Sequence, residues 1–189
     1  MRCSRVSMPS AGRAEPSPDM GGGLPGQVAA ERTAGIRIER DDPGREDVRH
    51  LLAGHLADMF ATSPAESVHA LAPAALSDPA ITFWTARQGT EVLGCGALKE
   101  IGPGECELKS MRTAAHARGR GIGSRLLSHI LAEARDSGYT RLFLETGSQE
   151  FFAPARRLYH RHGFVECAPF AGYVPDPNSV FLARELRTG

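Results

Sequence analysis

The segment Arg118–Ser124 (RGRGIGS) places three glycines and two arginines directly before an apolar helical pattern. Such a turn is typical of a phosphate-binding site, because glycines allow the backbone to approach the ligand and arginines add positive charge. The unpaired N–H groups at the start of the helix attract anions as well. The alternative is a glycine-rich turn between a strand and a helix, with the arginines on the surface.

Two common nucleotide-binding motifs fit this segment poorly. The dinucleotide fingerprint G-x-G-x-x-G would need a third glycine where Ser124 stands, and the triphosphate-binding loop would need a lysine before its Ser or Thr. The segment also follows an antiparallel meander in mid-domain, whereas a dinucleotide site belongs to a parallel β-α-β unit. An RNA-binding RG segment is typical of a disordered basic context. The residues therefore favour another phosphate-bearing ligand.

The elements around this segment are those of a mixed α+β domain over residues 35–189. Short turns that contain glycine separate the apolar runs between residues 81 and 113, so we expect an antiparallel meander there. Other segments, before and after these runs, have apolar residues at helical spacing. We expect helices over 44–61, 66–76, 121–137 and 153–162, and strands over 36–42, 81–87, 91–101, 106–113, 141–146, 164–170 and 179–186.

Composition bounds the remaining possibilities. The 22 Lys and Arg residues equal the 22 Asp and Glu residues, so no overall charge attracts nucleic acid or an anionic membrane. No apolar run approaches the roughly 20 residues that a membrane-spanning helix needs. The four cysteines lie far apart without a C-x-x-C pair, which indicates reduced thiols. We expect a cytoplasmic protein without a metal site and without nucleic-acid or membrane partners.

Residues 1–34 differ in composition from the rest of the chain. They are rich in Pro, Gly, Arg and Ser and poor in large apolar residues, so they cannot offset the entropy lost on ordering. We expect a disordered N-terminal tail, or a start assigned too early, with Met8 or Met20 as the true first residue. The remaining length suits a single domain.

Several motifs resemble those of one enzyme family. The pattern Arg118-x-x-Gly121-x-Gly123 resembles the acetyl-CoA signature [RQ]-x-x-G-x-[GA] of the GNAT family of N-acetyltransferases. The strands ELKSMRT and LFLET and the segment LYHRHGF resemble family segments in the same order, over about residues 35–189. The segments ESVHAL, FLETG, FAPARRLY and DPNSVF resemble a bacterial acetyltransferase subgroup. The resemblance implies a three-layer α+β fold, with a mostly antiparallel central sheet flanked by about four helices.

The resemblance also implies acetyl-CoA as the co-substrate, with no metal. In the family, the backbone of Met111, Arg112 and Thr113 pairs with the pantetheine arm like an added strand. The amides of the following turn wrap the pyrophosphate, and here that turn consists of Arg118, Gly119, Arg120, Gly121, Ile122, Gly123 and Ser124. One position departs from the family: Phe152 stands where many relatives carry Asn, so a cofactor contact from that position is not carried over.

Transfer of an acetyl group to an amine requires a base, because an alkyl amine with a pKa near ~10.4 is mostly protonated at neutral pH. Glu107 stands where one branch of the family has its general base. The alternation of side chains along a strand predicts that Glu107 shares a face with Lys109 and Met111. The alternatives are a surface glutamate paired with Lys109, and Glu145 on the neighbouring strand as the base.

The departing thiolate must receive a proton, and the resemblance assigns this step to Tyr159. A core aromatic residue beside Leu158 is the alternative. The resemblance also suggests acceptor contacts from His69 and His55, for which packing roles are alternatives. Tyr173, in a loop stiffened by Pro175 and Pro177, is a further candidate for an acceptor contact, and a rigid turn between two strands is the alternative there.

His160 and His162 diverge on a helix, so we expect solvated side chains rather than a metal pair. The acceptor is expected to be a primary amine of a small molecule or a protein amino group, reacting directly in a ternary complex. A non-catalytic acyl-CoA sensor is the alternative, and a homodimer is left open.

Overall fold

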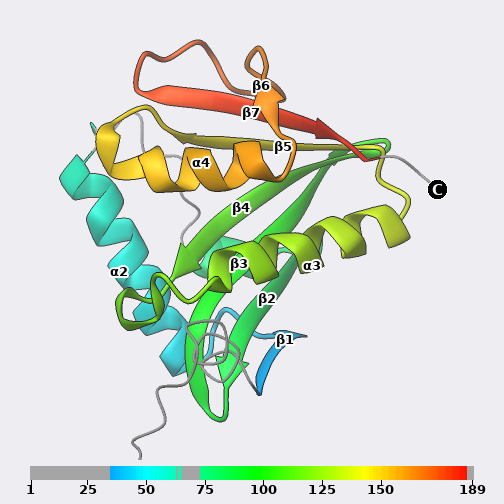
Figure 1. Cartoon of the computed structure of the whole chain (residues 1–189). Coiled ribbons are helices and arrows are strands. Elements are labelled where there is room, and N and C mark those ends of the chain that lie inside the picture. Colours follow the sequence, from blue (N-terminus) through cyan, green and yellow to red (C-terminus); the bar gives the residue numbers. More distant parts are fainter. Residues whose placement is uncertain (1–34, 63, 65–72, 187–189) are drawn as a thin grey trace, which may run out of the picture.

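The computed structural model describes residues 35–62, 64 and 73–186 (Figure 1). The expected tail 1–34, most of the expected helix 66–76 and the candidate His69 lie outside the described residues. The remaining strands and helices follow the expected order. They are β1 (Ile36–Arg40), α2 (Glu46–Thr62), the 3-10 helix η2 (Pro73–Ser77), β2 (Ile81–Gln88), β3 (Glu91–Gly102), β4 (Glu105–Thr113), η3 (Ala115–Ala117), α3 (Ile122–Asp136), β5 (Arg141–Gly147), η4 (Glu150–Phe152), α4 (Ala153–Arg161), β6 (Val165–Glu166) and β7 (Ser179–Glu185).

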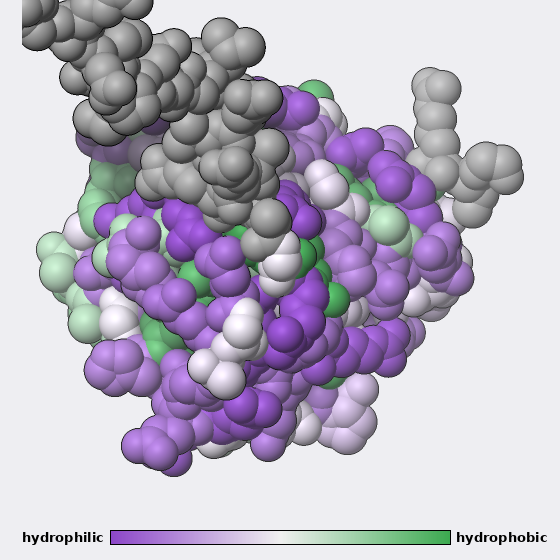
Figure 2. Space-filling view, turned by 60° about the horizontal axis from the view of Figure 1, so that its bottom comes forward, coloured by the Kyte–Doolittle hydropathy of each residue, from purple (hydrophilic) through white to green (hydrophobic). Residues whose placement is uncertain are grey.

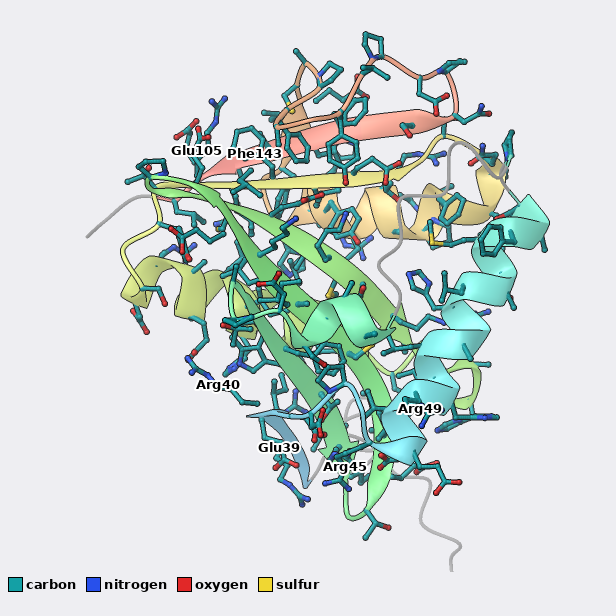
Figure 3. All side chains as sticks on the ribbon, turned by 180° about the vertical axis from the view of Figure 1, so that it is seen from behind. Glu39, Arg40, Arg45, Arg49, Glu105 and Phe143 are labelled. Atoms are coloured by element: carbon teal, nitrogen blue, oxygen red, sulfur yellow. The ribbon has the colours of Figure 1, made fainter. Side chains whose placement is uncertain are left out.

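The strands form one seven-stranded sheet in the order β1-β2-β3-β4-β5-β7-β6. Neighbouring strands are antiparallel except β4 and β5, which are parallel, so the expected mostly antiparallel sheet is confirmed. The two parallel strands pair only between Glu105–Glu107 and Arg141–Phe143. Beyond this point they diverge (Figure 1), and Figure 3 labels Glu105 and Phe143 at the closed end of the opening. The splayed strands leave one edge of β4 without a partner strand.

Helices cover both faces of the sheet, which completes the expected three layers. Helices α3 and α4 pack on one face, where their apolar residues join the largest core cluster. Helix α2 and η2 cover the other face and pack against β2 and β3, as seen from behind in Figure 3. The described residues contain three α-helices. Most of the expected second helix, 66–76, lies outside them, and its last residues, 73–76, belong to the 3-10 helix Pro73–Ser77. No helix in these ranges has the length and apolar character needed to span a bilayer.

The apolar stripe expected on α3 faces the core. Its members are each 3% exposed or less, and full burial of such a side chain contributes about 1.5–3 kcal/mol. They are Ile122, Leu126, Leu127, Ile130, Leu131 and Ala134. By contrast, the face of the molecule seen in Figure 2 is mostly hydrophilic where the residues are described. The pattern therefore fixes which side of α3 packs on the sheet.

A β-bulge in β4 changes which side chains share a face. Cys95 of β3 pairs with Arg112 of β4, and Ala97 pairs with Lys109, so β4 has one more residue than β3 between these two pairs. Ser110, within this stretch of β4, adopts a positive φ of 53°. The extra residue reverses the alternation of side chains beyond it. Met111 therefore packs against the core cluster under α3. The expectation that Met111 shares a face with Glu107 and Lys109 is wrong for this reason.

Candidate active site

The turn before α3 has the backbone shape that the sequence predicts for an anion site. Gly119 and Gly121 have φ values of +75° and +76°, a region that other residues adopt at a cost. A Cβ at either position would meet no protein atom within 4 Å, so the space beside the turn is open. Gly121 caps α3 without a side-chain hydrogen bond. The first N–H groups of the helix, including that of the buried Ile122, are left for a ligand.

Gly123 has a different role from the two glycines before it. Its φ is not positive, and a Cβ there would lie 3.3 Å from Leu158 Cδ2 and 3.5 Å from Thr113 Oγ1. The missing side chain therefore lets α3 pack closely on α4 and β4. Ser124 follows in the first turn of the helix, where its hydroxyl lies 3.1 Å from His162 Nε2.

Asp58 of α2 connects that helix to the arginines of the predicted cofactor segment. Its Oδ2 accepts a hydrogen bond from Arg112 at 2.5 Å and lies 3.8 Å from the exposed guanidinium of Arg118. Arg120 donates a hydrogen bond to Gln88 at 2.6 Å. In the sequence, the apolar spacing over 44–61 indicates only that Asp58 lies on the outer side of a helix. Its partners come from a distant part of the chain, so no local pattern could reveal them.

The free edge of β4 suits an extended ligand. Residues Met111–Thr113 lie beyond the last pair of β4 with β5, so β5 does not use their backbone groups. Within the described residues, Ser110 Oγ and Arg112 Nε are buried without a hydrogen-bond partner. Buried polar atoms of this kind are rare, because leaving them unpaired costs free energy. The fit with the pantetheine arm of acetyl-CoA, which carries amide groups, is therefore good.

A cavity of about 80 Å³ lies between α2, β4, β5 and α4. Met111, Glu145, Phe152 and Tyr159 all contribute to its wall. Phe152, at the position where many relatives carry Asn, thus presents an aromatic ring to the cavity. The structure brings together two of the proposed catalytic side chains, Glu145 and Tyr159, whereas Glu107 and Tyr173 do not line this cavity.

Tyr159 is both a core residue and a cavity residue. Its side chain is 6% exposed and packs edge-on against Phe164, with the ring centroids 5.8 Å apart. Burial raises the pKa of the Tyr159 hydroxyl well above its usual value near 10, and the charge of Glu145 raises it further. The hydroxyl is therefore protonated at neutral pH and can act as a donor. The packing role considered from the sequence is confirmed, and the role of Tyr159 as proton donor stays a prediction.

Glu107 belongs to a buried hydrogen-bonded triad. It is 4% exposed and accepts hydrogen bonds from Tyr173 OH at 2.7 Å and Lys109 Nζ at 3.1 Å. Lys109 Nζ also donates to Tyr173 OH at 2.7 Å. Burial, followed by the charge of Glu107, raises the pKa of Tyr173. The ion pair between Glu107 and Lys109, considered above as an alternative, is present. The two candidate site residues Glu107 and Tyr173 are hydrogen-bonded to each other.

Glu145 and His55 are the titratable side chains of the cavity besides Tyr159 and Lys109. Glu145 lies on β5, is partly buried and accepts a hydrogen bond from Ser179 Oγ at 2.7 Å. His55 reaches the cavity from α2. Burial lowers the pKa of His55 to about 4, with a smaller contribution from Arg112, so its imidazole is neutral at pH 7.

The other histidine pair behaves only partly as expected. Both His160 and His162 form hydrogen bonds to backbone: His160 Nδ1 lies 3.1 Å from the carbonyl oxygen of Phe164, and His162 Nδ1 lies 2.9 Å from that of Leu158. The expectation of solvated side chains holds for His160, which is exposed, and only in part for His162, which is partly buried. The local pattern could not reveal the serines of α3 that face it.

Comparisons with known proteins agree with this geometry. The family model described as "Acetyltransferase (GNAT) family" matches residues 46–164. The uncharacterized N-acetyltransferase YsnE of Bacillus subtilis is 48% identical over 151 residues, which are 80% of this chain and 100% of the relative. The IAA acetyltransferase of Azospirillum brasilense is 39% identical over 155 residues, which are 80% of this chain and 98% of the relative.

Solved structures have the same fold. A GNAT family acetyltransferase from Elizabethkingia anophelis with acetyl-CoA bound superposes with a TM-score of 0.59 at 20% identity. The superposition covers 81% of this chain and 99% of that one.

Proposed function

The chain belongs to the acetyltransferase (GNAT) family, and from this premise we propose that it transfers the acetyl group of acetyl-CoA to a primary amine by direct attack in a ternary complex. The amine belongs to a small molecule or to a protein. One observation carries the proposal: the free edge of β4 leads from the glycine turn at Gly119–Gly121 to a cavity that contains Glu145 and Tyr159.

The chain's own residues provide the binding steps. The first-turn N–H groups of α3, together with Arg118 and Arg120, would hold the pyrophosphate of acetyl-CoA. The backbone of Met111, Arg112 and Thr113 would hold its pantetheine arm. When bound, acetyl-CoA supplies a thioester whose carbonyl carbon is the electrophile. The unpaired hydroxyl of Ser110 is close to this path and adds a hydrogen-bond donor at the cavity.

We assign the base to Glu145 and a positioning role to Glu107. Glu145 lies at the cavity wall, where it can take a proton from the ammonium form of the acceptor, directly or through water. Glu107 remains the other candidate, but it does not line the cavity, and its Oε1 accepts hydrogen bonds from both Lys109 and Tyr173. The neutral amine would then attack the carbonyl carbon: the C–N bond forms, the C–S bond breaks, and the departing thiolate takes the proton of Tyr159. The proton lost by the nitrogen as the amide forms returns to the Tyr159 phenolate, so the step balances.

Three variants test these assignments: Glu145→Gln, Glu107→Gln and Tyr159→Phe. Removal of a general acid or base typically costs about 10²–10⁴-fold in rate, so we expect Glu145→Gln and Tyr159→Phe to lose at least about 100-fold in kcat. Their affinity for acetyl-CoA should change little. Glu107→Gln should raise the KM of the acceptor more than it lowers kcat. The exposed Glu150 provides the control variant Glu150→Gln.

The assay follows thiol release from acetyl-CoA over a panel of free amino acids, polyamines and lysine peptides. IAA is added to the panel, because the name of one relative includes it. Calorimetric titration measures acetyl-CoA binding separately. If Glu145→Gln retains full kcat while Glu107→Gln loses it, the base is Glu107. If acetyl-CoA does not bind, the proposal as a whole is wrong. The sensor alternative predicts binding without turnover, and relatives named as acetyltransferases do not favour it.

A further inference from the structure

A shallow cavity of about 440 Å³ lies on the outer side of α3 and α4, away from the proposed catalytic cavity. We call it the basic groove. None of the described residues that line it is acidic. The polar and charged positions come from three elements: Ser128 and Arg135 of α3, Arg161 and His162 at the end of α4, and Arg184 of β7.

The positive charge of the basic groove is not neutralised by nearby carboxylates. Neither Arg135 nor Arg161 forms an ion pair with a described residue, and Arg184 donates its hydrogen bond to the carbonyl oxygen of His162. Burial and the like charge of Arg135 both lower the pKa of Arg184. The chain has equal numbers of acidic and basic residues. Three arginines that gather without a carboxylate therefore create a local excess of positive charge.

Two glutamates share a different cavity with two of these arginines, outside the lining of the basic groove. Arg135 and Arg184 also line a second cavity of about 510 Å³, whose wall includes Glu166 and Glu185. Glu185 is paired with Arg141, whose Nε lies 3.0 Å from its Oε1. Among the described residues, the lining of the basic groove therefore contains three arginines and no carboxylate, which favours an anion there.

His162 joins the basic groove to the glycine turn. Its Nε2 lies 3.1 Å from Ser124 Oγ and 3.4 Å from Ser128 Oγ. Its Nδ1 lies 2.9 Å from the carbonyl oxygen of Leu158, which can only accept, so Nδ1 carries a proton. Ser124 stands in the first turn of α3 and Ser128 one turn later. One side chain of the groove therefore contacts the first turn of α3, which we propose holds the pyrophosphate.

We propose that the basic groove binds a phosphate monoester, held by Arg135, Arg161 and Arg184 together with the hydroxyl of Ser128. Arginine guanidinium groups match the geometry of phosphate oxygens and form charge-assisted hydrogen bonds to them. Two sources share this chemistry. One is the 3′-phosphate of bound coenzyme A, which rests on the proposed function. The other is a separate phosphate-bearing molecule, which does not.

The experiment uses the full chain at low ionic strength, where charge contacts are least screened. Calorimetric titration compares coenzyme A, 3′-dephospho-coenzyme A and inorganic phosphate as ligands. The test variant is Arg135→Gln/Arg161→Gln. The matched control is Arg157→Gln, because Arg157 is an exposed arginine of α4 outside the groove. Gly121→Ala separates phosphate bound at the glycine turn from phosphate bound in the groove.

If the groove holds the 3′-phosphate, the wild-type protein binds coenzyme A at least about tenfold more tightly than the dephospho form, as expected for one or two charged hydrogen bonds. The test variant then loses this preference, whereas Arg157→Gln keeps it. If the groove holds a separate molecule, the wild-type protein shows no such preference, and inorganic phosphate binds even to protein saturated with coenzyme A. That binding is lost in the test variant and kept in Gly121→Ala.

The proposal is overturned if wild type shows neither the preference nor the phosphate binding, or if the test variant leaves both intact. A chain that fails to bind any form of coenzyme A contradicts the proposed function. In that case the inorganic phosphate titration decides on the groove alone, so the two failures are distinguishable.

Discussion

Replacement of Arg87 by methionine should destabilise the fold strongly, because Arg87 joins α2 to the sheet from a buried position. Its side chain is 2% exposed, and its NH2 and NH1 atoms lie 2.7 Å from Asp41 Oδ2 and Asp47 Oδ2. In Arg87→Met, the Asp41 carboxylate, 7% exposed, loses its cation. Breaking a buried pair in this way costs about 3–5 kcal/mol. Loss of the ion pair with Asp47 adds less than about 1 kcal/mol to this cost, because the Asp47 side chain is 39% exposed and solvent screens its charge.

The pH dependence of this loss has a definite sign. Burial alone would raise the pKa of Asp41, but hydrogen bonds from Thr85 and Arg87 hold it below its usual value. The hydrogen bond from Arg87 lowers the pKa of Asp47 from 3.8 to about 2, against a smaller opposing effect of burial. Because both folded-state pKa values are lowered, their contribution is complete above the unfolded-state pKa near ~3.9 and is lost as the pH falls toward 2. Without Arg87, the hydrogen bond and the charge through which it lowers the pKa of Asp41 are both lost, so ionisation of Asp41 stabilises the fold less and stability depends less on pH.

Urea unfolding at pH 7 and at pH 3.5 measures both effects. The single tryptophan, Trp84, is 2% exposed in the core, so its fluorescence reports the unfolding transition. The control is Arg37→Met, because Arg37 is 55% exposed and pairs with Glu39 on the surface. The control should cost less than about 1 kcal/mol. A loss below about 1 kcal/mol in Arg87→Met, or a pH dependence like that of wild type, would refute the reasoning.

Three further predictions follow from single sites. Gly121→Ala should lower the free energy of unfolding by about 1–2 kcal/mol, because of its positive φ, and should weaken acetyl-CoA binding in calorimetry. The control is Gly138→Ala, at the other end of α3, where φ is +83°. It should lower the free energy of unfolding by a similar amount without changing that binding. Asp58→Asn should tighten coenzyme A binding several-fold at low salt, because it removes a carboxylate beside the arginines of the cofactor segment; weaker binding would contradict this role. Burial raises the pKa values of the Cys95 and Cys106 thiols to about 12. Mass spectrometry should therefore detect no alkylation of these two thiols by iodoacetamide at pH 8 in the folded protein, and full alkylation in urea. Labelling of the native state would show that β3 and β4 open.

The fold could be predicted from sequence wherever local pattern and burial coincide. The α3 stripe of Ile122, Leu126 and Ile130 repeats at helical spacing, and the structure buries all three. The glycine turns between β2, β3 and β4 could only lead to an antiparallel meander. The turn at Gly119 and Gly121 was also predictable, because a positive φ there requires residues without a Cβ.

The catalytic side of the molecule was less predictable. A single bulge at Ser110 moved Met111 to the other face of β4, and strand alternation contains no sign of such an insertion. Glu107 and Glu145 are both strand glutamates in sequence. Only the contact of Glu107 with Tyr173, sixty-six positions away, and the splay of β4 from β5 distinguish them.

The sequence by itself determined the class of fold, the family and the position of the anion-binding turn, since each depends on residues close together in the chain. The tertiary structure decided which carboxylate lies at the cavity, which buried pair fastens α2 to the sheet, and where Arg135, Arg161 and Arg184 meet. These features depend on side chains from separate elements that approach one another only when the sheet and its helices have packed. Hydrophobic periodicity specifies the packing face of an element, but it carries no information about the polar partners that the packing brings together.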